Sequence, residues 1–315
     1  MIHVHLTKDS STRLCQCRGV FVLVLSLIFF SCASNHAVVP DASYAERSES
    51  LYIPREVTWQ PLEGCTWASY FFFENTDYPV RYHCVKIELS SSAVQLVTFP
   101  RSEDDFTHKQ GVATTYFHGL TAKQFAKRTG ALISVNTAPF NGKNRRWKLI
   151  AKILSTRTIC GIHIVEGTQL SSPRAPYSAL CFKKTGEGYE GAIVKNQGTA
   201  DFSLYDFAFG GFYTILSDSE KASFARQSND SRTAAGLSAD GETLYLLVVE
   251  GERRHRSHGL SYPECADIML ALGATDALQM DGGDSSSLFI NGKNALSYPA
   301  LRKNAVFLGF KKLSF

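Results

Sequence analysis

Apolar residues in this chain fall mainly into short runs, several of which alternate with polar residues as the two faces of a β-strand do. The runs 81–89 and 94–99 alternate and are separated by serines, which predicts a hairpin. The runs 233–239 and 243–249 flank Asp240-Gly241, the strongest hairpin signal in the sequence. Three further strands with glycine-bearing turns are expected at 162–165, 179–182 and 192–194.

Two segments carry helical signals instead. The first begins after Thr121 and stops at Gly130. The second begins with Ser261-Tyr-Pro-Glu264, the pattern of a capping box, and ends at Gly273. Together these elements predict an α+β fold, a strand-rich mixed sheet with a few short helices. Because no Pro/Gly/Ser-rich linker interrupts residues 58–315, one domain is expected there.

A short buried strand follows each predicted helix and ends in a polar residue, Asn136 in the first case and Asp281 in the second. Two such helix–strand units would bring both ends to the same edge of a sheet. After Asp281 come Gly282 and Gly283, which allow the backbone to approach a ligand closely, and then a row of serine hydroxyls. An Asp-Gly hairpin turn would not need so many polar groups, so we interpret this stretch as a functional site.

The first 32 residues are typical of an export signal. Three basic residues precede an apolar run at 20–30 that is too short to span a bilayer comfortably. The run ends at Ser31-Cys32, which resembles a bacterial lipoprotein signal with Cys32 as the lipidated residue. A plain signal peptide cut near Ala33 and an uncleaved anchor are the alternatives. Residues 33–57 are polar and without periodicity, which predicts a tether.

Composition narrows the function further. The chain is 44% hydrophobic and 20% charged, as folded proteins are, and beyond residue 32 it carries 30 Lys and Arg against 28 Asp and Glu. That balance does not favour nucleic-acid binding. No CxxC pair lies beyond the signal, so a zinc site has no support. An exported protein could join Cys65 to Cys84 or Cys160 to Cys181, and would leave Cys265 free.

Familiar catalytic motifs are absent from the sequence. Gly283-Asp-Ser285 resembles the Gly-Asp-Ser block of an esterase superfamily, but no histidine follows His258 to act as its base. There is no Gly-x-Ser-x-Gly elbow, P-loop or His-Glu-x-x-His. Carboxylates at Asp281, Glu264 and Glu250, with Arg232, remain as candidates, and they suit chemistry at an anomeric carbon. Simpler interpretations stay open: a helix cap for Glu264, an exposed turn for Glu250 and a surface salt bridge for Arg232.

Blocks spread over residues 130–310 resemble the phosphodiester glycosidase family in their order and spacing. The blocks are 133–140 (ISVNTAPF), 161–167 (GIHIVEG), 232–236 (RTAAG), 246–251 (LLVVEG), 259–269 (GLSYPECADIM) and 277–286 (ALQMDGGDSS). Three positions depart from the family pattern. Glu250 stands where aspartate is usual, Asp284 replaces a glycine, and Thr137-Ala138 replaces a glycine pair.

The resemblance implies a single phosphodiester-glycosidase-like domain that hydrolyses a sugar-1-phosphodiester. It would release a GlcNAc-type sugar from a phosphate-linked envelope or exopolysaccharide glycan and leave a phosphomonoester. Asp281 would be the main catalytic carboxylate, with Glu264 or Glu250 as the second, and Arg232 would bind the phosphate. The expected substrate contacts are Asn136, Thr233, His258, Gly282, Gly283, Ser285 and Ser286.

No cofactor is required by this chemistry, although Asp281 and Asp284 offer oxygen ligands of the kind that calcium prefers. Two other functions fit the same residues. The chain could be a surface lipoprotein that binds envelope glycan without turnover, or a transferase that uses the same site. The expected partners are therefore a phosphorylated glycan and, through Cys32, a membrane.

Overall fold

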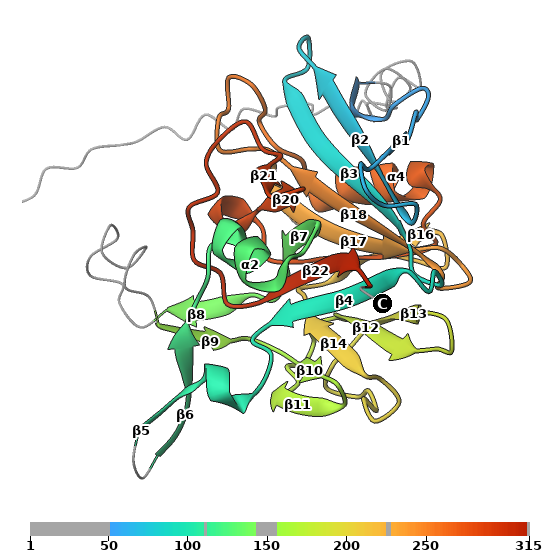
Figure 1. Cartoon of the computed structure of the whole chain (residues 1–315). Helices are drawn as coiled ribbons and strands as arrows, with labels where there is room; N and C mark the ends of the chain where they lie inside the picture. Colours follow the sequence, from blue (N-terminus) through green and yellow to red (C-terminus); the bar gives the residue numbers. More distant parts are fainter. Residues whose placement is uncertain (1–50, 110–111, 143–155, 225–227, 314–315) are drawn as a thin grey trace, which may run out of the picture. The chain divides into compact units, whose positions relative to one another are not determined.

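The computed structural model describes residues 51–109, 112–142, 156–224 and 228–313. The predicted signal, its Cys32 and most of the predicted tether lie outside these residues. The described chain forms four antiparallel sheets and two α-helices, as the sequence predicted for a strand-rich α+β fold (Figure 1). Among these residues, no helix is long and apolar enough to cross a membrane.

The largest sheet has eight strands in the order β1-β2-β3-β18-β17-β19-β15-β16. Its strands are β1 (Gln60–Pro61), β2 (Ala68–Asn75), β3 (Val80–Glu88), β15 (Thr214–Ser217), β16 (Glu220–Lys221), β17 (Arg232–Leu237), β18 (Thr243–Val249) and β19 (Asp276–Gln279). The predicted hairpin at Asp240-Gly241 is confirmed, because β17 and β18 pair from Arg232↔Val249 to Leu237↔Leu244. Gly241 has φ +71°, a conformation that favours glycine.

Three smaller sheets complete the fold. One, in the order β21-β20-β7-β22-β4, contains β4 (Val94–Phe99), β7 (Ile133–Asn136), β20 (Leu288–Ile290), β21 (Lys293–Asn294) and β22 (Phe307–Lys312). A second, in the order β11-β10-β14-β12-β13, contains β10 (His163–Val165), β11 (Thr168–Ser171), β12 (Ala179–Lys184), β13 (Tyr189–Val194) and β14 (Phe207–Gly210). The third, in the order β5-β6-β9-β8, contains β5 (Thr107–Lys109), β6 (Val112–His118), β8 (Phe140–Gly142) and β9 (Thr156–Ile159).

Both predicted helices are confirmed with their caps. Helix α2 (Ala122–Thr129) starts with a capping box between Thr121 and Gln124 and ends at Gly130 in the left-handed conformation. Helix α4 (Tyr262–Leu272) starts with a capping box between Ser261 and Glu264. Two short 3-10 helices, η1 (Glu103–Asp105) and η2 (Gly283–Ser285), lie in loops.

The predicted hairpin between 81–89 and 94–99 is wrong. Strand β3 lies in the eight-stranded sheet, whereas β4 pairs with β22 in another sheet. The buried Leu89 between them donates a hydrogen bond to Glu242 O (2.7 Å) and accepts one from Tyr189 N (2.8 Å). The intervening serines form hydrogen-bonded turns, with Val94 N donating to Ser91 O (3.1 Å), but these turns connect two sheets and do not close a hairpin.

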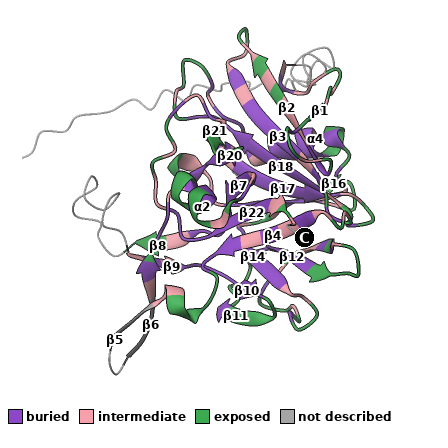
Figure 2. Ribbon diagram, viewed as in Figure 1, coloured by how far each residue is buried: buried purple, intermediate pink, exposed green. Residues whose placement is uncertain are grey.

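Buried residues lie mainly on the strands of the sheets (Figure 2). Helix α4 contributes a second apolar cluster through Cys265, Ile268 and Met269. Tyr52 belongs to this cluster, and its hydroxyl donates a hydrogen bond to Asp267 (2.9 Å). Residues around Tyr52, which we assigned to the tether, therefore pack against the domain. All five cysteines beyond the signal have free thiols, so neither of the predicted disulfides forms here.

Candidate active site

The ends of β7 and β19 meet although the two strands belong to different sheets. The Asn136 side-chain amide donates a hydrogen bond to Asp281 O (2.6 Å), and Asp281 N donates one to Thr137 O (2.8 Å). The sequence predicted that these ends would share one sheet edge. They lie together instead at a junction between two sheets, and the stretch that follows Asp281 begins there.

The Asn136 side chain is fully engaged with the protein. It is 1% exposed, and its carbonyl oxygen accepts hydrogen bonds from Thr233 Oγ1 (3.2 Å), Ser287 N (2.9 Å) and Ser287 Oγ (3.3 Å). The amide therefore ties β7, β17 and the serine row to the backbone of Asp281. In this geometry Asn136 and Thr233 position the site, because their polar atoms already have protein partners.

Asp281 has the electrostatic character of a catalytic carboxyl group. Burial, the largest influence, raises its pKa to about 7, although part of the residue's surface reaches solvent. Hydrogen bonding from the Ser285 side chain and the positive charges of Arg302 and Arg157 act in the opposite direction, while Asp284 raises the pKa further. A carboxyl group with a pKa near neutrality can both donate and accept a proton at physiological pH.

The glycines after Asp281 form a tight, half-buried turn, and the serines that follow are buried. Gly283 N donates a hydrogen bond to Ser231 O (2.8 Å), and Gly283 has φ +59°. A Cβ atom at Gly282 would lie 2.8 Å from Ser231 O, so the turn needs glycine for close packing on β17. Ser285 and Ser286 are each 2% exposed, and the Ser286 hydroxyl is buried without a hydrogen-bond partner among the described residues.

Two arginines that the sequence analysis did not single out act electrostatically on Asp281. Arg157 and Arg302 lie over the ring of Phe140, at 4.7 and 5.2 Å from its centroid. Arg302 also forms an ion pair with Asp284, the predicted calcium ligand. No group of three or more His, Cys, Asp and Glu side chains among the described residues is arranged to hold a metal ion. Neither arginine lies in a motif, so nothing local in the sequence could have identified it.

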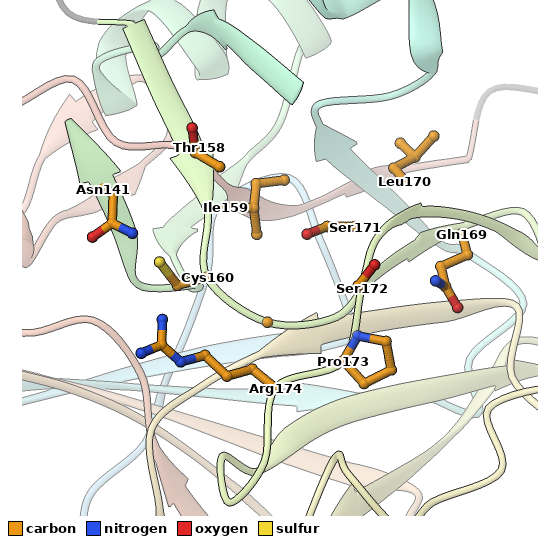
Figure 3. Close-up of a pocket in the computed structure, with 11 residues that line it drawn as sticks. Asn141, Thr158, Ile159, Cys160, Gln169, Leu170, Ser171, Ser172, Pro173 and Arg174 are labelled. Carbon is orange, nitrogen blue, oxygen red and sulfur yellow. The ribbon is translucent and has the colours of Figure 1, made fainter. Parts of the chain in front are cut away.

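A cavity of about 430 Å³ is lined in part by strands β8 and β9, which carry Phe140 and Arg157. It is lined by Asn141, Thr158, Ile159, Cys160, Gly161, Gln169, Leu170, Ser171, Ser172, Pro173 and Arg174 (Figure 3). The Arg174 guanidinium points toward Cys160 and Asn141. Burial raises the pKa of the Cys160 thiol, and Arg174 lowers it. The charge of Asp281 also raises the pKa of Cys160, so Asp281 acts electrostatically on a residue of the cavity wall. Amide, hydroxyl and guanidinium groups on this wall suit a polar ligand such as a sugar.

Arg232 lies on the other flank of the turn, with its guanidinium held by the protein. Its Nε donates a hydrogen bond to Leu260 O (2.8 Å), its Nη2 donates one to Ser228 O, and the group stacks over the Tyr262 ring at 4.6 Å. Burial raises the pKa of Tyr262, while the charge of Arg232 lowers it. Asp281 also acts on Tyr262. Arg232 and Asp281 therefore share a neighbour, but no hydrogen bond between them is present in the described structure.

Glu264 and His258 form a separate group at the start of α4. Glu264 Oε2 accepts hydrogen bonds from Ser261 N (2.7 Å) and Ser261 Oγ (2.6 Å), which completes the capping box. Tyr78 donates a hydrogen bond to Glu264 Oε1 (3.3 Å), and its ring packs edge-on against His258 at 4.4 Å. Burial lowers the pKa of His258, which favours its neutral form.

Glu250 is buried in a hydrogen-bonded network and does not lie in an exposed turn. It is 1% exposed, and its carboxylate accepts hydrogen bonds from His83 Nε2 (2.9 Å), Ser297 N (2.9 Å) and Ser297 Oγ. The other ring nitrogen of His83 is 2.7 Å from the hydroxyl of Tyr70. Burial raises the pKa of Glu250, but the hydrogen bonds from His83 and Ser297 outweigh it, and the net pKa is lowered.

A family model described as phosphodiester glycosidase matches residues 129–311. No curated protein matches the chain significantly. The fold resembles the zebrafish N-acetylglucosamine-1-phosphodiester alpha-N-acetylglucosaminidase catalytic domain, auto-inhibited by its pro-peptide, with TM-score 0.55 and 15% identity over 80% of this chain and 87% of that one.

Two other solved structures share the fold. A hypothetical protein from Synechocystis has TM-score 0.58 and 13% identity, over 81% of this chain and 64% of that one. The chain thus spans less than two thirds of that protein. An inferred exported protein from Burkholderia pseudomallei has TM-score 0.53 and 16% identity over 74% of each chain.

Proposed function

Because the chain belongs to the phosphodiester glycosidase family, we propose that it hydrolyses a sugar-1-phosphodiester, with Asp281 as the catalytic carboxyl group. The products would be a free GlcNAc-type sugar and a phosphomonoester, and the substrate would be a phosphate-linked envelope or exopolysaccharide glycan. The single observation that carries the proposal is the buried carboxyl group of Asp281, whose pKa is raised to about 7 and whose charge acts on Cys160 in the wall of a polar cavity. A proton-transfer group works best when its pKa lies near the operating pH.

Support for a sugar ligand comes from the cavity wall. Asn141, Gln169 and Ser171 place amide and hydroxyl groups along it, and these are the groups that bind sugar hydroxyls. The volume of about 430 Å³ lies within the usual range for small-molecule sites, roughly 300–1,000 Å³. The sugar would occupy this cavity, and its anomeric carbon would face Asp281.

The remaining candidates take supporting roles in this proposal. Asn136 and Thr233 hold the backbone of Asp281, and Ser285 tunes its carboxyl group. Glu264 caps α4, next to His258 and Tyr78. Glu250 is tied to His83 and Ser297. Arg232 supports the glycine turn, since Gly282 packs against its backbone and side chain.

We further propose that the protein is exported and anchored to the cell envelope through Cys32, where phosphate-linked glycans are accessible. The apolar run before Cys32 supports this location. Metabolic labelling with a radioactive fatty acid tests it, comparing wild-type protein with Cys32→Ser. Equal labelling of both forms would contradict lipidation at Cys32.

Activity is tested with UDP-N-acetylglucosamine or a synthetic α-GlcNAc-1-phosphodiester, by measuring release of free N-acetylglucosamine. We expect turnover by the wild-type protein and a loss of about 10²–10⁴-fold in Asp281→Asn, whose circular dichroism spectrum should be unchanged. Saturable glycan binding without any turnover would identify a glycan-binding protein instead. Transfer of the sugar to an added alcohol in preference to water would identify a transferase.

A further inference from the structure

The residues best placed to bind a phosphate are Arg157 and Arg302, which lie 145 positions apart and meet at Phe140. Both guanidiniums lie over the same ring, at 4.7 and 5.2 Å from its centroid. Phe140 and Arg157 come from the paired strands β8 and β9, which also carry Asn141 and Ile159 of the cavity wall. Neither arginine lines the cavity, but the strands that carry Phe140 and Arg157 form part of the wall of the cavity in which the sugar is proposed to bind.

The long side chain of Arg157 is buried and held in place by the protein. It is 6% exposed, and its Nε donates a hydrogen bond to Lys303 O (2.8 Å). Two glycines make room for it: a Cβ atom at Gly142 would lie 2.8 Å from Arg157 Nη1, and one at Gly119 would lie 3.1 Å from Arg157 Cγ. Because the guanidinium is already ordered, little side-chain entropy would be lost when it binds an anion.

The same backbone segment connects the arginine pair to the serine row. Lys303, whose carbonyl holds Arg157, follows Arg302 directly, and the next residue, Asn304, donates a hydrogen bond to Ser285 O (2.8 Å). Ser285 in turn acts on the carboxyl group of Asp281. Arg302 and Asp281 are therefore fixed relative to each other through a short, hydrogen-bonded path.

The local charge balance favours an anionic ligand. Burial and the nearby charge of Arg302 lower the pKa of Arg157 to about 10, so the Arg157 guanidinium remains positive at neutral pH. Like charges held this close repel each other unless an anion lies between them. Asp284 neutralises part of this charge by pairing with Arg302. Arg302 Nε is nevertheless buried without a hydrogen-bond partner among the described residues, a state that a phosphate oxygen would relieve.

We propose that Arg157 and Arg302 bind the phosphate of the substrate, and that Asp284 is an internal counter-ion which the phosphate displaces from Arg302. This inference rests on the proposed function for the identity of the anion. It changes the role that we expected for Arg232, whose guanidinium already donates to two backbone carbonyls. It also gives Asp284 a role: its negative charge would weaken the binding of anions that do not also fill the sugar cavity.

The test measures binding without requiring turnover. Isothermal titration calorimetry on the intact protein would give the affinity for inorganic phosphate and for N-acetylglucosamine 1-phosphate. We expect Arg302→Gln and Arg157→Gln each to weaken binding roughly 10–100-fold, the usual cost of losing a charged hydrogen bond. Arg157→Lys keeps the charge but not the forked geometry, and its affinity for phosphate should fall about tenfold. Asp284→Asn should tighten the binding of inorganic phosphate several-fold.

Two arginine variants serve as controls. Arg128→Gln removes an arginine that also stacks over a phenylalanine, Phe99 at 5.7 Å, but on helix α2. Arg232→Gln removes the arginine first expected to bind phosphate. Both should bind phosphate within about threefold of wild type. Because the buried Arg157 could be needed for folding, Arg302→Gln, at a partly exposed side chain, provides the decisive comparison.

Wild-type affinity in Arg302→Gln, loss of binding only in Arg232→Gln, or no phosphate binding by the wild-type protein would each overturn the inference. Phosphate binding through the pair by a protein that releases no sugar would support the anion site and contradict the proposed hydrolysis. The two proposals can therefore fail separately.

Discussion

The side-chain amide of Asn136 donates a 2.6 Å hydrogen bond to the backbone carbonyl of Asp281, across the junction of two sheets. This contact joins two strand ends that are 145 residues apart in the sequence. It fixes the backbone from which the candidate catalytic carboxyl group extends, and the same amide accepts hydrogen bonds from Thr233 and Ser287. The site therefore depends on a buried residue whose side-chain amide is bonded to the protein itself.

Replacing Asn136 should damage stability and activity together. Asn136→Ala removes the partner of Ser287 N and Asp281 O, and an unsatisfied buried polar group costs about 1–3 kcal/mol. We expect a lower free energy of unfolding in urea and a lower kcat with little change in KM. Asn75→Ala is a matched control, since the partly buried Asn75 amide also donates to a backbone carbonyl, Leu51 O (2.8 Å), and its Oδ1 accepts from Asp77 N (3.0 Å), outside the site. Unchanged kcat in Asn136→Ala would contradict the positioning role.

Asp281 should destabilise the folded protein above neutral pH. Its pKa is raised from 3.8 to about 7, so between these values the unfolded chain loses a proton that the folded chain keeps. The stability contributed by Asp281 therefore falls as pH rises from about 4 to about 7, by on the order of 1–4 kcal/mol. Asp281→Asn should match wild type near pH 4 and be more stable at pH 8.

Urea unfolding of wild-type protein and Asp281→Asn at both pH values checks this expectation. Asp240→Asn is a suitable control, because hydrogen bonding from the Ser238 side chain lowers the pKa of that exposed carboxyl group. An Asp281→Asn variant less stable than wild type at pH 8 would be inconsistent with a raised pKa.

The buried pair of Glu250 and His83 should stabilise the fold, and this contribution should be lost in acid. The pKa of Glu250 is lowered overall, so its contribution is present above about pH 4.5 and is lost as pH falls through the lowered value. Glu250→Ala removes the partner of His83 Nε2 and of Ser297, and breaking such a buried pair costs about 3–5 kcal/mol. Urea unfolding of Glu250→Ala, His83→Ala and the double variant gives the coupling energy between the two side chains.

If that coupling energy were near zero, the pair would not stabilise the fold as its geometry indicates. Lys184→Ala is the control, because Lys184 forms an exposed ion pair with Glu166 that shares no residue with this network. Exposed ion pairs contribute little, so its free energy of unfolding should change by less than about 1 kcal/mol.

A bulky residue at the rim of the cavity should weaken substrate binding. Ser172 lines the cavity and is exposed, so Ser172→Trp would obstruct it without disturbing the core. We expect KM for the sugar phosphodiester to rise by about tenfold, or ~1.4 kcal/mol, while Tm stays constant. Ser203→Trp, at an exposed loop position away from the cavity-lining residues, is the control. An unchanged KM in Ser172→Trp would show that the sugar binds elsewhere.

Features that depend on neighbours in the chain were predictable from the sequence. The two capping boxes at Thr121 and Ser261 and the hairpin at Asp240-Gly241 each involve residues a few positions apart, and all three are confirmed. The strand that ends at Asp281 was identified from its apolar run and its glycines. The family resemblance was likewise readable, because blocks of fixed order and spacing survive in the sequence itself.

Only the tertiary structure decided which distant residues meet. The alternation of β3 and β4 fixed their strand character but not their partners, which come from β2, β18 and β22. For Glu250, a candidate carboxylate from the sequence, only the structure shows burial and pairing with His83 in place of the alternative, an exposed turn. Arg157 and Arg302 belong to no motif, and only their shared contact with Phe140 in the structure identifies them as a pair. Local backbone preferences are encoded in adjacent residues, whereas burial, strand pairing and electrostatic fields arise when remote segments pack together.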